Sequence, residues 1–204
     1  MNINAKEKIN IKVETLQSVS DVDLADLCNI TEHAIRAGGG FGWLKVPTRD
    51  VLKKYWNGLV VVQNRILVVG RLNDAIAGAL QLGLQSPNNE AQKNIATITS
   101  HFVVPWARGY GLAKNMIDHA ETVARESSIV CIQLDIRETQ EAAIQLFKSK
   151  GYEQWGTNPS YAQVEGNLIK HIDHGLIKVE AGQDLSDRLA DKIRLIEDDV
   201  ELQR

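Results

Sequence analysis

One stretch near the middle of the chain limits the possible folds more than any other. An apolar strand is predicted over residues 95–104, and Pro105 ends it. Gly109 and Gly111 follow in a turn, and a helix with a regular apolar stripe is predicted over residues 111–127. Successive backbone N–H groups of such a turn can point at one position, where the helix dipole adds positive potential. The turn is therefore a candidate site for a phosphate or pyrophosphate group.

Two other interpretations of the turn stay open on these residues alone. Gly109-Tyr110-Gly111 is also compatible with a plain connection between strand and helix. A dinucleotide-binding turn would need a third glycine, where the chain has Lys114, although Asp135 does stand near the end of the next strand. About 100 residues of other structure precede the turn, which disfavours this second interpretation.

Strand and helix patterns alternate along the rest of the chain and predict one domain that mixes helices and strands, α/β (α+β) in class. Strands are expected over residues 9–16, 65–71, 75–85, 129–136 and 162–179, and helices over residues 21–37, 48–57 and 139–150. Asn73-Asp74 is typical of the turn of a β-hairpin. The strand over residues 129–136 is almost entirely apolar, as expected of a buried central strand.

Residues 180–204 differ in character from the chain before them. Apolar residues recur every three to four positions among charges, which predicts an amphipathic helix. The expected organisation is one domain over residues 11–179 with a helical extension over residues 180–204. The apolar face of the extension docks on the protein's own body or forms a homodimer contact, and the sequence leaves both open.

Charge and cysteine content exclude several classes of function. The net charge is −3 and the pI is near 6.0, so we expect no nucleic-acid partner. No apolar run is long enough for a membrane span and residues 1–12 have no signal-peptide core, so we expect a cytoplasmic protein with no membrane partner. Cys28 and Cys131 lack the paired spacing of a zinc site, and we expect no metal.

The turn also carries a motif. Arg108-x-x-Gly111-x-Ala113 resembles the R/Q-x-x-G-x-G/A signature of the GNAT acetyltransferases. The segment 146–152, Leu-Phe-Lys-Ser-Lys-Gly-Tyr, resembles the helix end that follows in that family. The resemblance implies a GNAT fold, in which a central, mostly antiparallel mixed sheet is flanked by helices and its two middle strands splay apart.

Further segments resemble one branch of the family, that of the tabtoxin-resistance acetyltransferases. They are Phe41-Gly42-Trp43, Tyr55-Trp56, Gly78-Ala79-Leu80-Gln81-Leu82, Pro87-Asn88, residues 105–109 and residues 155–162. They occur in the same order as in that branch, and the match covers residues 11–178.

The resemblance implies that acetyl-CoA is the co-substrate. Its pantetheine arm is expected to contact the backbone of Phe102, Val103 and Val104. Its pyrophosphate is expected at Arg108, Gly109, Tyr110, Gly111, Leu112 and Ala113. Gln140 stands where many relatives have an Asn that contacts the cofactor.

Two positions depart from the family pattern. Thr97 stands where relatives often carry a Glu that accepts the amine's proton, and Phe147 stands where many carry a Tyr proposed to protonate the thiolate. Strand alternation predicts that His101 shares a face with Thr97, and its imidazole is the candidate base. Tyr161 is the candidate acid or substrate contact.

The region of Phe41 and Trp43 covers the acceptor pocket in the family, and both are candidate substrate-binding residues. The function expected from the resemblance is acetyl transfer from acetyl-CoA to a primary amine of a small molecule, by direct attack on the thioester. Acetylation of a protein N-terminus or lysine is one alternative. A non-catalytic acetyl-CoA-binding module is the other, and Thr97 and Phe147 are its support.

Overall fold

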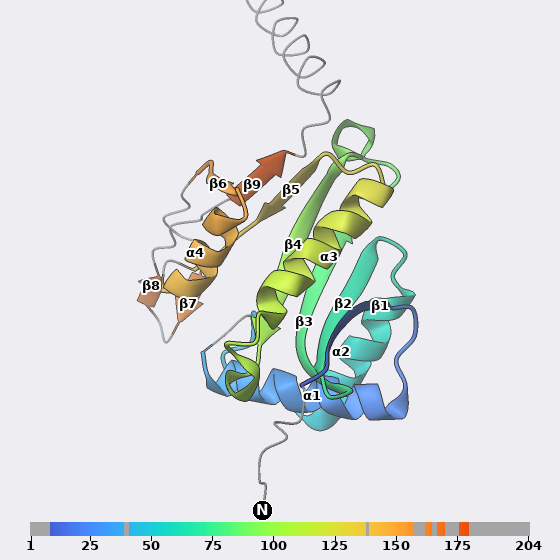
Figure 1. Ribbon diagram of the computed structural model, residues 1–204, viewed down its shortest axis with the longest axis vertical. Helices are drawn as coiled ribbons and strands as arrows, with labels where there is room; N and C mark the ends of the chain where they lie inside the picture. The colour runs from blue at the N-terminus through green and yellow to red at the C-terminus, as the bar shows by residue number, and fades with distance from the viewer. Residues whose placement is uncertain are drawn as a thin grey trace, which may run out of the picture.

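Strands and helices alternate along the chain, close to where the residue pattern changes. Their bounds are β1 (Ile11–Leu16), α1 (Asp21–Arg36), α2 (Arg49–Val61), β2 (Arg65–Leu72), β3 (Ala75–Leu84), β4 (Ile95–Val103), α3 (Leu112–Glu126), β5 (Cys131–Leu134), α4 (Glu141–Ser149), β6 (Glu153–Gln154), β7 (Ala162–Val164), β8 (Asn167–Ile169) and β9 (Leu176–Val179). In this computed structural model, shown in Figure 1, the described residues are 9–38, 41–137 and 139–156, with the backbone of β7, β8 and β9.

A seven-stranded sheet organises the described residues, in the order β1-β2-β3-β4-β5-β9-β6, and β7 pairs with β8 separately. Within the seven-stranded sheet only β4 and β5 are parallel. The mostly antiparallel mixed sheet and the α+β class expected from the sequence are confirmed. In Figure 1, α3 crosses one face of the sheet, and α1 and α2 cover the other.

Local signals place most element ends. Ser20 caps α1, its hydroxyl accepting a hydrogen bond from the Asp23 N–H at 3.1 Å. Asn73 and Asp74 have φ angles of 48° and 71°, as the hairpin turn requires. Some predicted lengths were wrong, and the described backbone of residues 162–179 contains three short strands, β7, β8 and β9, where one or two were expected. The α2 helix continues past residue 57 to bury Leu59, and β5 is shorter than predicted because residues 127–129 close the end of α3.

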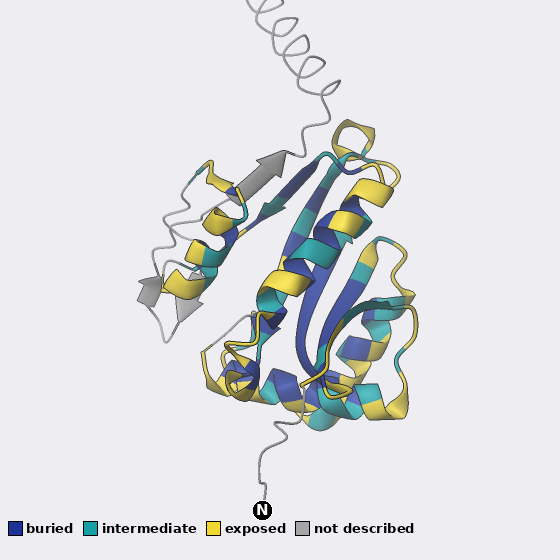
Figure 2. Ribbon diagram, in the orientation of Figure 1, coloured by how far each residue is buried: buried dark blue, intermediate teal, exposed yellow. Residues whose placement is uncertain are grey.

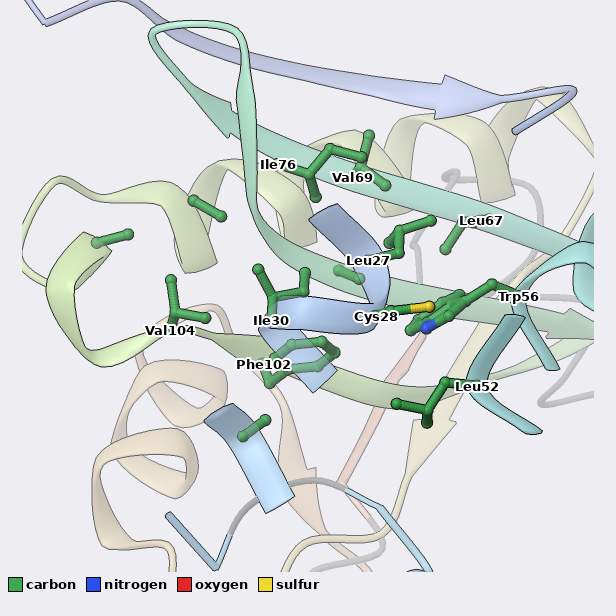
Figure 3. Packing of buried hydrophobic residues seen from close by; sticks show 14 of the residues in the cluster. Leu27, Cys28, Ile30, Leu52, Trp56, Leu67, Val69, Ile76, Phe102 and Val104 are labelled. Atoms are coloured by element: carbon green, nitrogen blue, oxygen red, sulfur yellow. The ribbon is translucent and has the colours of Figure 1, made fainter. Parts of the chain in front are cut away.

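The sheet separates two apolar cores, which appear as buried residues on both of its faces in Figure 2. The first core, packed by α1 and α2, includes Leu27, Trp56 and Phe102 (Figure 3). The second core is packed by α3 and α4 and includes Met116 and Phe147. Close approach of α3 depends on Gly78 of β3, where an added Cβ would lie 2.9 Å from the Met116 methyl group.

The β4 strand changes face part-way along because it contains a β-bulge. The two steps from Ala79 to Gln81 on β3 are matched by three steps from Phe102 to Thr99 on β4. Ser100 lies in the bulge with a φ angle of 50°. Strict alternation would put residues 98 and 102 on one face. Instead residue 98 belongs to the second core, and Phe102 points into the first (Figure 3).

The β4 and β5 strands pair only along the first part of β4. Their register runs from Ile95–Cys131 to Ile98–Leu134, whereas β4 continues to Val103. Beyond Ile98 the edge of β4 that faces β5 therefore has no strand partner in the described residues. This is the parting of the middle strands that the family resemblance implied.

Three expectations concern residues outside the described part. The helix predicted over residues 180–204, the dimer contact assigned to it and the position of Tyr161 all lie there. Among the helices of the described residues, none is long and apolar enough to cross a membrane.

Candidate active site

The glycine turn opens directly onto the N-terminal end of α3. A single 3-10 turn, Pro105–Ala107, follows β4, and residues 108–111 are exposed. Gly109 and Gly111 have φ angles of 86° and 78°, a left-handed backbone that suits glycine. An added Cβ at either glycine would meet no atom within 4 Å. The first turn of α3 contains no acidic residue. The turn thus exposes helix N–H groups with no competing carboxylate among its own residues.

Two basic side chains stand beside the turn and point in different directions. The Arg108 side chain is exposed, with its Nε 3.4 Å from the Val103 carbonyl oxygen. Lys114 pairs with Asp118 one helical turn further along, at 2.9 Å. Burial acts to raise the pKa of Asp118, but hydrogen bonds from Lys150 and Lys114 lower it overall. Arg108 is therefore the cation of this pair that stays closer to the turn.

The segment between β5 and α4 reaches the same edge of the sheet, because parallel strands end on the same side. Gln140 occupies the N-cap position of α4. Arg137 lies just before it and donates to the Phe41 carbonyl oxygen at 3.1 Å and to the Gly38 carbonyl oxygen at 3.5 Å. Arg137 thereby ties the α1–α2 loop to the C-terminal half of the sheet.

An aromatic-lined pocket of about 300 Å³ lies between the α1–α2 loop, α2 and β4. Phe41, Gly42, Trp43, Tyr55 and Ser100 line it. The Phe41 and Trp43 rings stack with centroids 5.6 Å apart, and Trp43 meets Tyr55 edge-on at 5.0 Å. The two predicted substrate-binding residues, Phe41 and Trp43, are thus brought together in one pocket.

His101 does not share a face with Thr97, and that expectation was wrong. The bulge at Ser100 turns the imidazole toward the second core, where it meets Phe147 edge-on with ring centroids 5.5 Å apart. Its Nε2 is shielded from solvent and has no hydrogen-bond partner in the described residues. Burial lowers the pKa of His101 to about 4, although a hydrogen bond with the Ala113 backbone acts to raise it. The ring is therefore neutral at neutral pH.

The other two departures from the family pattern lie in the paired part of β4 and on α4. The Thr97 hydroxyl accepts a hydrogen bond from the Gln133 amide across β4 and β5, at 3.3 Å. Phe147 is fully buried and packs edge-on against Tyr152, with ring centroids 5.1 Å apart. In the described residues, no group of three or more His, Cys, Asp or Glu side chains could hold a metal ion.

Sequence reasoning missed four residues that shape this region. Tyr55, Ser100 and Gln81 form or support the pocket, and Arg137 holds its loop. One signal was available, since Gln81 interrupts an otherwise apolar strand. A polar side chain there needs a buried partner. The bulge that exposes Ser100 to the pocket left no comparable mark in the sequence.

The family assignment rests on a sequence comparison. A sequence model of the "Acetyltransferase (GNAT) family" matches residues 30–152, which is more than half of the chain. The chain belongs to the GNAT acetyltransferase family. The enzyme class expected from the family resemblance, an acyltransferase, is confirmed by this membership, and so is the GNAT fold.

Individual relatives agree with this assignment. An uncharacterized N-acetyltransferase of the hisH-hisA intergenic region of Azospirillum brasilense is 47% identical over 131 residues, covering 64% of this chain and 78% of that protein. The protein yncA of Salmonella typhimurium, solved with its cofactor acetyl-CoA, is similar in fold with a TM-score of 0.68 and 15% identity, over 85% of this chain and 96% of that one. A ribosomal-protein-alanine N-acetyltransferase of Brucella melitensis has a TM-score of 0.69 and 18% identity, over 83% and 99%.

Proposed function

We propose that this acetyltransferase moves the acetyl group of acetyl-CoA to a primary amine of a small molecule. The observation that carries the proposal is the open glycine turn at the start of α3, placed at the edge where β4 and β5 part. The resemblance to the tabtoxin-resistance branch supports a small acceptor. The pocket of about 300 Å³ also supports it, since it lies at the lower end of the usual range for small-molecule sites.

The residues of the turn fit a pyrophosphate. Gly109 and Gly111 leave room for a close approach, and the first N–H groups of α3 up to Ala113 are free of helical partners. Arg108 adds positive charge. Tyr110 is 43% exposed, whereas Leu112 is buried, so Leu112 contributes its backbone alone. Gln140 reaches the same edge from α4.

The unpaired edge of β4 fits the pantetheine arm. We assign the backbone contact at this edge to Val103, because Phe102 and Val104 turn their backbone groups toward β3. The Val104 N–H donates to the Ala77 carbonyl at 3.0 Å, and its own carbonyl accepts from the Ala107 N–H at 3.0 Å. Bound acetyl-CoA supplies the thioester, and the chain's part is to hold it beside the pocket.

The described pocket residues include no usual base that could remove a proton from the acceptor amine. The described residues that line the pocket include no carboxylate and no histidine. We therefore propose that the acceptor enters as the free amine, so that the rate rises with pH through the amine's own ionisation.

The base role of His101 and the acid role of Tyr161 stay predictions. The domain bounds 11–179 and the extension 180–204 stay proposals too, supported by the pairing of β9 with β5 up to Val179.

Calorimetry with acetyl-CoA tests the turn through two matched variants. Gly111→Trp puts a bulky side chain on the turn, and Gly151→Trp puts one at the end of α4, where φ is 84° and the space is equally open. Both carry the same backbone strain. We expect Gly111→Trp to weaken acetyl-CoA binding by about tenfold or more, and Gly151→Trp to keep it. Equal losses in both variants, or no wild-type binding at millimolar ligand, would contradict the proposal.

A further inference from the structure

The pocket has a mostly aromatic lining that includes two side-chain hydroxyls. Three of its five residues are aromatic, and Tyr55 and Ser100 bring the side-chain hydroxyls. None of the described lining residues is charged. Tyr55 is half-buried and lines the pocket, and its hydroxyl also belongs to a hydrogen-bond chain that includes Gln81.

Arg65 determines which groups donate and which accept along this hydrogen-bond chain. Arg65 Nη1 donates to Gln81 Oε1 at 3.1 Å. A guanidinium has donors only, so the Gln81 amide must turn its oxygen toward Arg65 and its nitrogen away. The Gln81 Nε2 then donates to the Tyr55 hydroxyl oxygen at 2.5 Å. Gln81 is 1% exposed, and its alternation along β3 turns it toward α2, where Tyr55 lies.

The hydrogen bond from Gln81 does not use the hydroxyl proton of Tyr55. Because the Tyr55 oxygen accepts from Gln81, the hydroxyl proton of Tyr55 has to point away from Gln81. Within the described part of the chain, that proton has no hydrogen-bond acceptor. Hydrogen bonds in a row strengthen one another, so the Tyr55 hydroxyl is a better donor than an isolated phenol.

We propose that Tyr55 donates this hydrogen bond to an uncharged carbonyl oxygen of the acceptor, while the rings of Phe41 and Trp43 hold an apolar side group. The proposal rests on the amine acetylation proposed above and names its substrate class: small amides or esters of apolar α-amino acids. An uncharged oxygen fits better than a carboxylate, because no cation lines the described pocket and Arg65 is engaged by Gln81.

Kinetics with three primary amines that share one aromatic side group tests the proposal. Phenylalaninamide carries the carbonyl, phenethylamine lacks it, and phenylalanine replaces it with a carboxylate. We expect the wild type to prefer the amide. Tyr55→Phe should lower kcat/KM for the amide by about tenfold and leave phenethylamine nearly unchanged. Gln81→Leu should reproduce that pattern, because the phenol then loses its orientation. Tyr152→Phe, a buried tyrosine outside the pocket, should change neither.

Each of the other outcomes would overturn one part of the proposal. Equal losses for the amide and phenethylamine in Tyr55→Phe would mean that the ring only packs. A wild-type preference for phenylalanine would overturn the uncharged oxygen. If the wild type acetylates no amine, the proposed function fails, and calorimetry of phenylalaninamide decides the inference separately. Binding that Tyr55→Phe weakens by about fivefold or more supports it, whereas equal or absent binding overturns it.

Discussion

At the scale of single residues, burial rather than a neighbouring charge determines the pKa of His101. Its Nε2 is enclosed between the start of α3 and the Phe147 ring and has no partner in the described residues. Water cannot solvate an added proton there, so the pKa falls to about 4. A histidine in this state accepts protons only in acid. It adds a pH dependence to stability that can be measured without any substrate.

The expected sign follows from the two pKa values. An unfolded histidine binds its proton near pH 6.5, whereas folded His101 binds it near pH 4. The stabilisation is therefore complete above pH 6.5 and is lost as the pH falls toward 4. We expect the free energy of unfolding to drop by an extra amount on the order of 2–3 kcal/mol between pH 7 and pH 4.5, and His101→Gln to remove that extra drop. Urea unfolding at the two pH values measures it.

The same variant tests the predicted base role. A base with a pKa near 4 leaves the rate flat above pH 5, so only amine ionisation should shape the profile. A loss in kcat of about tenfold in His101→Gln at pH 7, with acetyl-CoA affinity unchanged, supports the base role. Unchanged kcat leaves His101 with its structural role alone.

At the scale of elements, Arg137 joins parts that are far apart in the chain. It follows β5 and holds two carbonyl oxygens of the α1–α2 loop, nearly 100 residues earlier. That loop carries Phe41 and Trp43 into the pocket. A planar guanidinium can hold two carbonyls at once, which a lysine does less well. Arg137 is therefore a positioning residue for the acceptor side.

Replacing Arg137 should affect the acceptor more than acetyl-CoA. We expect Arg137→Met to raise the acceptor KM by about fivefold to tenfold, because the loop loses both hydrogen bonds, and to leave the Kd of acetyl-CoA within about twofold. Steady-state kinetics and calorimetry measure the two effects. Arg36→Met, at an exposed position of α1, is the control. A change of equal size in both constants would argue against a role confined to the loop.

At the scale of the whole molecule, the sheet has one weak junction. Four residue pairs join β4 to β5, and the second core bridges them through Ile98 and Phe147. By contrast β2 pairs with β3 from Arg65 to Leu72, with one register shift after Gly70. A ligand lying along the unpaired part of β4 would therefore protect the junction and leave the β2–β3 hairpin unaffected.

Hydrogen exchange can detect this protection. We expect acetyl-CoA to slow amide exchange in residues 99–103 and 109–116 by about tenfold or more, with little change in β2 and β3. Mass spectrometry of peptides from each region measures it. Uniform protection of all peptides would indicate general stabilisation, and protection confined to β1 and β2 would place the ligand elsewhere.

The sequence predicted what depends on local pattern. The hairpin at Asn73, the turn at Gly109 and Gly111 and the amphipathic α3 all follow from neighbouring residues. The contact of Gln81 with Tyr55 did not, because it depends on how β3 and α2 pack. The face of His101 was wrong for a related reason. Alternation assumes an unbroken strand, and nothing in the residues marks the bulge.

Because of that bulge, the side chains on the two faces of β4 depend on the exact number of residues in the strand. Through the extra residue at Ser100, one nine-residue strand supplies Ile98 to the second core and Phe102 to the first. A substitution at any of its positions alters one side chain. Loss or gain of a single codon would exchange the faces of every residue after it, so that both cores and the pocket wall would fail together. Divergence along β4 is therefore confined to changes that preserve its length.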